Sequence, residues 1–275
     1  MGLFSGLHTK VAVYMLYRLY VQLFDLEQRW NVLIIVIMII SMMIGAFGGL
    51  AENSIRRVLG YQMLNGMPFI LVMLAFTSDD PRRALAAGIM YTIHHMLTVG
   101  SLILASGAIE ETYGTGLLSK LSGLARRDPI IAWIFAAGAF SVVGFPPFSG
   151  MWGKLMIVFE IARVGGAWAW IAIAAIIIAS FAAFLAMLRV WRKVFWGKGL
   201  PEDKVPDELV IRKKLMAPSA ALILGSLCMF IFSGIVLDVV DSAAEQLLDT
   251  TAYTETVLGD EPIAVPTIDE IQEGR

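Results

Sequence analysis

The chain has 275 residues, of which 58% are hydrophobic and only 16% are charged, and its mean hydropathy is +0.74. An average soluble domain has about 25% charged residues, so this composition excludes an ordinary soluble protein and predicts an integral membrane protein. The formal net charge of -2 says little about partners, because the charges are segregated along the chain, and the single cysteine, Cys228, excludes an intrachain disulfide.

Apolar stretches long enough to cross a hydrocarbon core of about 30 Å recur along the chain. They predict an all-α, polytopic transmembrane helical bundle of about seven spans, one of them broken, over residues 1–240. An acidic extracytoplasmic tail is expected over 241–275, where nine acidic residues, one basic residue and the lack of a sustained helical pattern predict irregular structure. The expected crossings are 2–24, 31–50, 59–76, 84–109, 129–165, 168–195 and 215–240.

The positions of Lys and Arg between these stretches predict the orientation of the chain. If residue 1 is cytoplasmic, thirteen basic residues fall in inner loops and five on the outer side, and cytoplasmic loops carry the excess of Lys and Arg in membrane proteins. We therefore expect a cytoplasmic N-terminus and a C-terminus outside. Tryptophans that fit an aromatic belt are Trp30, Trp168 and Trp170 at the outer interface and Trp133, Trp191 and Trp196 at the inner one.

The first crossing carries polar side chains on one helix face. Lys10, Tyr14, Tyr17 and Arg18 recur at i, i+4, i+7 and i+8, which places them on the same side of a helix. For Arg18 we prefer an anchor that reaches the outer headgroups. An apolar run follows Lys10, so we expect this lysine to lie deeper and treat it as a candidate functional residue.

The fourth crossing has a continuous polar stripe near the middle of its apolar span. Tyr91, His94, His95, Thr98 and Ser101 follow i, i+3, i+4, i+7 and i+10. Imidazoles accept and donate protons near neutral pH, and hydroxyls or water can bridge the steps between them. A metal site is one alternative, although the chain has few further ligands for it. Two histidines that only hydrogen-bond to neighbouring helices are the other.

The fifth crossing, 129–165, is interrupted by the segment GFPPFSGMWGK at 144–154. Pro146 and Pro147 have no amide donor, so the carbonyls one turn before them lose their helical partners. Non-helical backbone at membrane depth is tolerated only where protein or a water-filled cavity satisfies it. Lys154 follows this break. An ionisable side chain at such depth is by default a candidate functional group.

Four segments, spread along the chain, carry a family resemblance. SGLHTKVAVYMLYR is similar to G-L-L-T-K-V-G-V-Y-x-L-x-R, and AENSIRRVLGYQ to A-x-N-D-I-R-R-x-L-x-F-H. HHMLTVGSLILASGAIEETYGT is similar to H-H-x-x-x-K-x-x-L-F-L-x-x-G-x-I-E-x-x-x-G-T, and GFPPFSGMWGK to G-x-P-P-x-S-G-F-x-G-K. These patterns resemble the antiporter-like subunits shared by Mrp-type multisubunit cation/proton antiporters and respiratory complex I. The four segments are most similar to those of the D subunit of Mrp antiporters, and the resemblance covers about residues 2–197.

The resemblance implies a fourteen-helix fold of two inverted five-helix repeats, each with a broken helix and a buried lysine. This chain resembles only the second half, and residues 31–195 would form the second repeat. Lys154 would match the lysine of the broken helix, and Lys10 the lysine of the central axis. His94 and His95 would match the histidine pair of the family.

Three departures from the family pattern affect this interpretation. The whole first repeat is missing, which suggests a split subunit or a truncated gene, and another chain would then supply that half. Val99 stands where the family has a buried lysine, which bears on whether this chain conducts by itself. Gln62 stands where many D subunits have histidine.

We therefore expect a membrane subunit of a monovalent cation (Na+)/proton antiporter in the plasma membrane of a prokaryotic cell. Its partners would be other subunits of the complex, protons, monovalent cations and the lipid bilayer. We expect no cofactor, metal, nucleic acid or enzymatic activity, because no phosphate loop or nucleophile constellation is present in the sequence. One alternative is a subunit of a proton-pumping respiratory or hydrogenase complex, and the other is a non-conducting structural subunit, which Val99 and the missing half favour. The expected proton path comprises Lys10, His94, His95 and Lys154, with Tyr14, Tyr91, Thr98 and Ser101 in support and Pro146 and Pro147 at the helix break.

Overall fold

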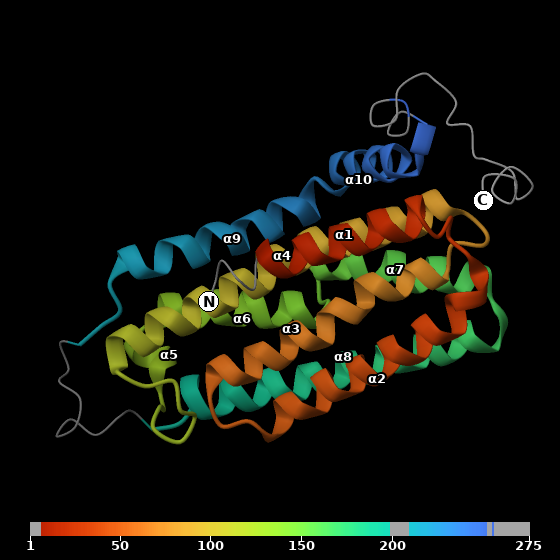
Figure 1. Cartoon of the computed structure of the whole chain (residues 1–275). Coiled ribbons are helices and arrows are strands. Elements are labelled where there is room, and N and C mark those ends of the chain that lie inside the picture. Colours follow the sequence, from red (N-terminus) through yellow and green to blue (C-terminus); the bar gives the residue numbers. More distant parts are fainter. Residues whose placement is uncertain (1–6, 199–208, 252–254, 256–275) are drawn as a thin grey trace, which may run out of the picture.

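The computed structural model describes residues 7–198, 209–251 and 255, and every regular element in them is a helix. The helices lie lengthwise beside one another (Figure 1). The all-α bundle predicted from composition is confirmed. The helices are α1 (Thr9–Gln22), α2 (Asn31–Ala51), α3 (Ile55–Leu71), α4 (Pro81–Tyr113), α5 (Leu124–Arg127), α6 (Pro129–Val143), α7 (Gly150–Val164), α8 (Gly166–Val190), α9 (Lys213–Ile231) and α10 (Ser233–Leu248), with 3-10 turns at Gln28–Trp30 and Val72–Ala75 and a π-helical turn at Trp191–Phe195.

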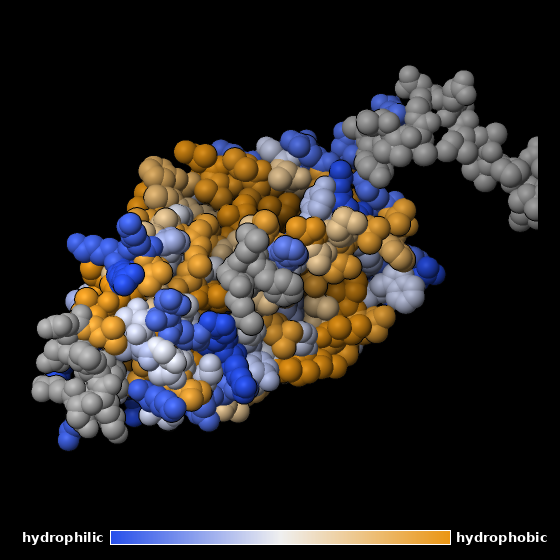
Figure 2. Space-filling model, turned by 60° about the vertical axis from the view of Figure 1, so that its left-hand side comes forward, coloured by the Kyte–Doolittle hydropathy of each residue, from blue (hydrophilic) through white to orange (hydrophobic). Residues whose placement is uncertain are grey.

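Five helical stretches among the described residues have the length and apolar composition to cross a membrane. On the face shown in Figure 2, much of the surface is hydrophobic, and hydrophilic side chains gather in separate patches. Of the other elements, α1 has 14 residues and α6 and α7 have 15 each, so none of these is long enough to cross alone. The five stretches are Gln28–Ala51, Ile55–Ala75, Pro81–Tyr113, Gly166–Phe195 and Lys213–Ile231.

Helix α4 is the centre of the bundle, because it packs against α3, α6, α7, α9 and α10. It begins at Pro81, whose missing amide is tolerated in the first helical turn, and Asp80 caps it by accepting from the Arg83 amide at 3.1 Å. Helix α2 packs against α3 and α8 on the other side of the bundle. This arrangement places the histidine pair of α4 close to the broken helix.

The break predicted from the two prolines is present between α6 and α7. Helix α6 ends at Gly144, which has a φ of 101°, a left-handed conformation that glycine adopts without strain. Helix α7 starts at Gly150. In Figure 1, α6 and α7 follow one another along the bundle and α8 runs back beside them, which fits the single interrupted crossing expected from the sequence.

The seventh crossing and the start of the tail differ from expectation. The helix expected over 215–240 is interrupted at Phe232, which separates α9 from α10. Residues 241–248, expected as irregular tail, continue α10. This helix is stable because Val240, Ala244 and Leu247 bury one face against the bundle. The rest of the expected tail beyond 251, apart from residue 255, lies outside the described residues, as do residues 2–6 of the first crossing.

Candidate functional site

A layer of polar side chains crosses the middle of the bundle between two apolar cores. One core includes Phe69, Ala87 and Ile157, and the other includes Leu59 and Leu102. Helices that enter both cores carry polar residues near the junction, so these residues meet in one layer. We define the polar layer as Lys10 of α1, Gln62 and Asn65 of α3, His94, His95 and Thr98 of α4, Ser141 of α6, Ser149 of the break, Lys154 of α7, Ser180 of α8 and Ser226 of α9.

Lys154 supplies the hydrogen-bond donor that the prolines remove. In a helix the Val143 carbonyl would accept from the amide of residue 147, and Pro147 has none. The Lys154 ammonium donates to this carbonyl at 2.8 Å and to the Ser180 hydroxyl, also at 2.8 Å. It also lies 5.3 Å from the centre of the Phe69 ring, within cation–π distance. The ammonium is therefore held at the C-terminal end of α6, where the helix dipole favours positive charge.

A closed ring of buried hydrogen bonds joins His94 to the broken helix. His94 Nδ1 lies 2.9 Å from the Ser149 hydroxyl and 3.3 Å from the Thr98 hydroxyl. Thr98 bonds to Ser141 at 2.8 Å. Ser226 of α9 closes the ring with bonds to Ser141 at 3.0 Å and to Ser149 at 2.7 Å. All five side chains are buried, so we call this set, His94, Thr98, Ser141, Ser149 and Ser226, the hydroxyl ring.

Two close contacts fix the position of the ring beside the break. A Cβ at Gly150 would lie 1.9 Å from the Ser141 carbonyl oxygen and 2.9 Å from the His94 ring, so only glycine lets α7 begin at this point. Tyr91 stacks on Phe69 with 5.2 Å between ring centres and meets His94 edge-on at 5.2 Å. Tyr91 thus links His94 of the hydroxyl ring to Phe69, and Lys154 lies over the Phe69 ring.

His95 faces α3 instead of the broken helix. A Cβ at Gly66 would lie 2.0 Å from His95 Nε2, which shows how closely the ring approaches α3. Both ring nitrogens of His95, both amide atoms of Gln62 and the Asn65 side-chain oxygen are buried and find no hydrogen-bond partner among the described residues. The ammonium groups of Lys10 and Lys154 are both near enough for their charges to act on the His95 ring.

Lys10 lies apart from the hydroxyl ring, in a pocket between α1, α4 and α10. Its side chain is buried and its ammonium donates to the Thr9 hydroxyl at 3.1 Å. Tyr14 lines the same pocket and accepts from Arg18 Nε at 3.0 Å. The Tyr17 hydroxyl donates to the Ile70 carbonyl at 2.6 Å and thereby attaches α1 to α3.

Two further positions of α4 do not join the hydroxyl ring. Ser101 pairs with Ser219 of α9, with 3.0 Å between the hydroxyls, and each hydroxyl also donates to the other residue's carbonyl. Val99 is 1% exposed and belongs to the apolar core that includes Leu102. The polar stripe of α4 is therefore divided among different neighbours.

Sequence reasoning did not single out the serines that complete the site. Ser141, Ser149, Ser180 and Ser226 each lie in an apolar surrounding sequence and show no periodic pattern. The only available signal was chemical: a hydroxyl in an apolar membrane helix tends to hydrogen-bond across helices.

The chain has extensive similarity to known membrane subunits. Residues 2–183 match the family described as NADH:quinone oxidoreductase/Mrp antiporter, TM. The D subunit of the Na(+)/H(+) antiporter of Bacillus subtilis (strain 168) is 31% identical over 259 residues, which are 94% of this chain and 51% of that protein. The N subunit of the NADH-quinone oxidoreductase of Hydrogenovibrio crunogenus is 30% identical over 211 residues, 76% of this chain and 42% of that protein.

Solved structures of membrane complexes also contain chains that are similar to this one. A chain in the structure of the Mrp complex from Dietzia sp. DQ12-45-1b superposes with a TM-score of 0.87 at 32% identity, covering 94% of this chain and 55% of that one. A chain of respiratory complex I from Thermus thermophilus has a TM-score of 0.65 at 21% identity, which supports the fold alone. The chain spans about half the length of the curated relatives it matches. It is a multi-pass membrane protein that belongs to the NADH:quinone oxidoreductase/Mrp antiporter family.

Proposed function

We propose that this chain is a membrane subunit of a multisubunit Na+/H+ antiporter, a secondary transporter and not an enzyme, and that protons cross its polar layer. The names of the D-subunit relatives and the Mrp complex support the transport class. The proposed path runs through Lys154, His94, His95 and Lys10.

The surroundings of Lys154 carry this proposal. A relay must be stable both with and without its proton. A carbonyl accepts from either form of the amine, and the Ser180 hydroxyl can accept from the ammonium or donate to the neutral amine. Among the described residues no carboxylate lies within 4 Å of Lys154 to hold the charged form. Both states therefore keep hydrogen-bond partners.

The hydroxyl ring supports proton transfer beside Lys154. Each hydroxyl in it can both donate and accept, whereas His94 Nδ1 either donates or accepts at one time, so a change in the protonation of this nitrogen reverses the direction of the bonds that it makes. His94 is the member of the ring with an ionisable side chain, and its Nδ1 bonds directly to the hydroxyls of Ser149 and Thr98. On the other side of α4, unsatisfied atoms of Gln62, Asn65 and His95 fit a hydrated position, since buried polar atoms are nearly always satisfied by protein or by ordered water.

We propose the orientation from charge, with the end of the bundle that carries α5 in the cytoplasm and α10 outside. Ion pairs neutralise the basic residues at the proposed outer end. Arg29 pairs with Glu27 at 2.7 Å, and Arg82 with Asp241 at 3.2 Å. Arg83 and Arg163 also have acidic partners. The transmembrane domain would follow residues 1–240, with the second repeat over 31–195.

A second candidate is a subunit of a proton-pumping redox complex, which the similarity to the N subunit of an NADH-quinone oxidoreductase favours. The same polar layer would serve both functions. The genes beside this one distinguish the two, because small antiporter subunits accompany the first and redox subunits the second.

Everted membrane vesicles test the proposal. The chain is expressed together with the subunits encoded beside it, a pH gradient is generated by respiration, and Na+ is added while a pH-gradient dye is followed. We expect Na+ to collapse the gradient in these vesicles, and not in vesicles that lack only this chain. Restoring the gene supplies the control. An equal response with and without the chain would contradict a role in transport and favour a structural subunit.

A further inference from the structure

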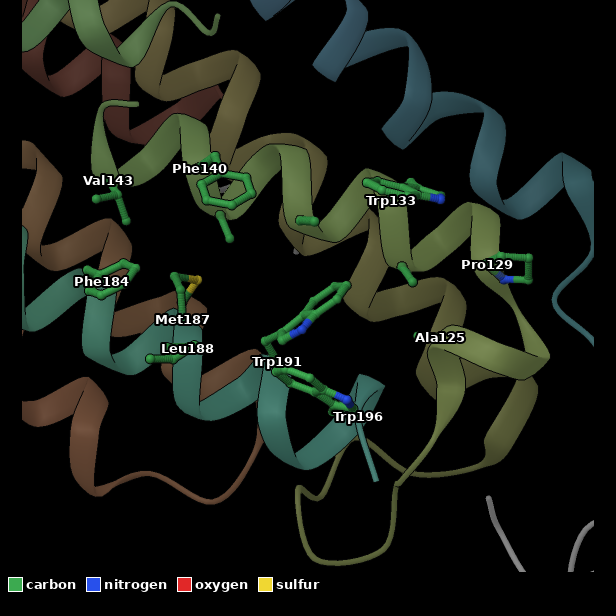
Figure 3. Close-up of a pocket in the computed structure, with 13 residues that line it drawn as sticks. Ala125, Pro129, Trp133, Phe140, Val143, Phe184, Met187, Leu188, Trp191 and Trp196 are labelled. Carbon is green, nitrogen blue, oxygen red and sulfur yellow. The ribbon is translucent and has the colours of Figure 1, made fainter. Parts of the chain in front are cut away.

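An apolar pocket of about 420 Å³ lies between α6 and α8, and only its Val143 end reaches the polar layer. Ala132, Ala136 and Ala139 of α6 form one wall. Small side chains here leave room beside Phe184 and Leu188 of α8. Figure 3 shows Val143 and Phe184 at one end of the pocket and Pro129, Ala125 and Trp196 at the other.

The pocket is long and narrow. Its lining extends along α6 from Pro129 to Val143, a rise of about 21 Å at 1.5 Å per residue. A volume of about 420 Å³ over that length gives a mean cross-section of only about 20 Å². The space is narrow and lined by apolar side chains, so an extended acyl chain fits along it.

Indoles line one end of the pocket, and basic residues that do not line it follow two of the lining residues in the sequence. Trp191 and Trp196 line this end, and indoles are favoured at the level of lipid headgroups. Arg126 follows the lining residue Ala125, and Arg192 follows Trp191 directly. Arg126, Arg192, Lys193 and Lys198 are all exposed, and none has an acidic partner within 4 Å among the described residues.

We propose that this pocket binds an anionic phospholipid, with one acyl chain between α6 and α8 and the phosphate at Arg126, Arg192 and Lys193. Guanidinium groups bind phosphate oxygens in pairs. Charge complementarity selects an anionic headgroup at the end where the basic residues gather. This inference goes beyond the proposed transport function and does not depend on it.

Native mass spectrometry of the purified full chain tests the proposal. The chain is delipidated in detergent and incubated with phosphatidylglycerol or with phosphatidylcholine of the same acyl chains. We expect one phosphatidylglycerol to be retained at least tenfold more than phosphatidylcholine. Filling the pocket with Ala136→Trp, or more mildly with Ala136→Leu, should abolish this retention. The double variant Arg192→Gln/Lys193→Gln should remove the headgroup preference.

Matched controls separate the pocket from the general surface. Ala174 of α8 is exposed and does not line the pocket, so Ala174→Trp should leave retention unchanged. Lys213→Gln removes an exposed cation at the start of α9 and should also have no effect. Equal retention of both lipids, or retention that survives both Ala136 variants, would overturn the proposal. So would a photo-crosslinking residue at position 136 that captures a subunit of the native complex in place of lipid.

Discussion

At the scale of single residues, Lys154 lies where the backbone itself lacks a donor. Pro147 cannot donate to the Val143 carbonyl, and the Lys154 ammonium donates in its place at 2.8 Å. Its second partner, the Ser180 hydroxyl, is also uncharged. Because neither partner carries a negative charge, the site stabilises the ammonium less than an ion pair would. That balance suits a group that must release its proton.

Gly66 determines how closely His95 approaches α3. A Cβ there would lie 2.0 Å from His95 Nε2, so Gly66→Ala should lower the free energy of unfolding by about 1–3 kcal/mol, the usual cost of overpacking. Gly60→Ala on the same helix meets no atom within 4 Å and should raise it by about 0.5–1 kcal/mol. Thermal unfolding of the purified variants measures both changes.

The double variant Gly66→Ala/His95→Ala identifies the cause of that loss. If the His95 ring is the obstacle, truncating it should recover most of the stability lost in Gly66→Ala. A Gly66→Ala variant as stable as Gly60→Ala would show that α3 and α4 are not so closely packed.

At the scale of elements, α9 holds the broken helix against α4. Ser226 bonds to Ser141 at the end of α6 and to Ser149 in the break. Ser219, two turns earlier on α9, bonds to Ser101 of α4 without contacting the break. Both serines therefore bond to buried hydroxyls, but only Ser226 contacts the broken helix.

Ser226→Ala should lower stability by about 1–3 kcal/mol, because it leaves buried hydroxyls unsatisfied. We also expect it to slow Na+-dependent proton transport about tenfold, with recovery in Ser226→Thr. Ser219→Ala should lose similar stability and keep transport. Transport and thermal unfolding of the same assembled complexes provide the comparison. If both variants transport equally well, the hydroxyl ring serves packing alone.

Local sequence signals predicted the elements that depend on local chemistry. The prolines predicted the break, and helical periodicity placed the histidines on one stripe of α4. The sequence did not predict that α10 continues beyond residue 240, because the acids there resembled those of a solvated tail. In the structure Asp241 lies 3.2 Å from Arg82 of α4, and the apolar face of α10 is buried. The hydroxyl ring was missed because its hydrogen bonds join residues up to 85 positions apart, and local sequence patterns do not show such contacts.

Val99 lies in an apolar environment that the sequence alone did not reveal. The family pattern has a buried lysine at this position, and here the valine is part of a continuous apolar core. A lysine at this position would bury a charge that the core does not pair, at a cost of about 2.5–3.5 kcal/mol. The proposed proton path therefore does not use this position.

At the scale of the whole molecule, charge is distributed unequally between the two ends of the bundle. At the end with α5, Arg56 and Arg57 pair with Glu110 and Glu52, but Arg126, Arg192, Lys193 and Lys198 are exposed and have no acidic partner among the described residues. At the other end Arg29, Arg82, Arg83 and Arg163 are all paired. This asymmetry predicts which end faces the cytoplasm.

Reporter fusions test the orientation. A reporter fused after Gly197 should be cytoplasmic, and one fused after Thr250 should lie outside, because α9 and α10 carry the chain across between them. Alkaline phosphatase and fluorescent protein fusions give opposite signals at the two positions. Both reporters on the same side of the membrane would contradict the proposed orientation and the crossing by α9.

Substitution of Lys154 by arginine tests the central claim, that this residue passes protons, most directly. Arginine keeps a positive charge and hydrogen-bond donors but does not release its proton at accessible pH. In everted vesicles that contain the assembled complex, Lys154→Arg and Lys154→Ala should both lower Na+-dependent proton transport at least tenfold, while Lys213→Ala should match the unaltered chain. Transport by an assembled Lys154→Arg complex at the unaltered rate would contradict the account and leave Lys154 as a structural cation.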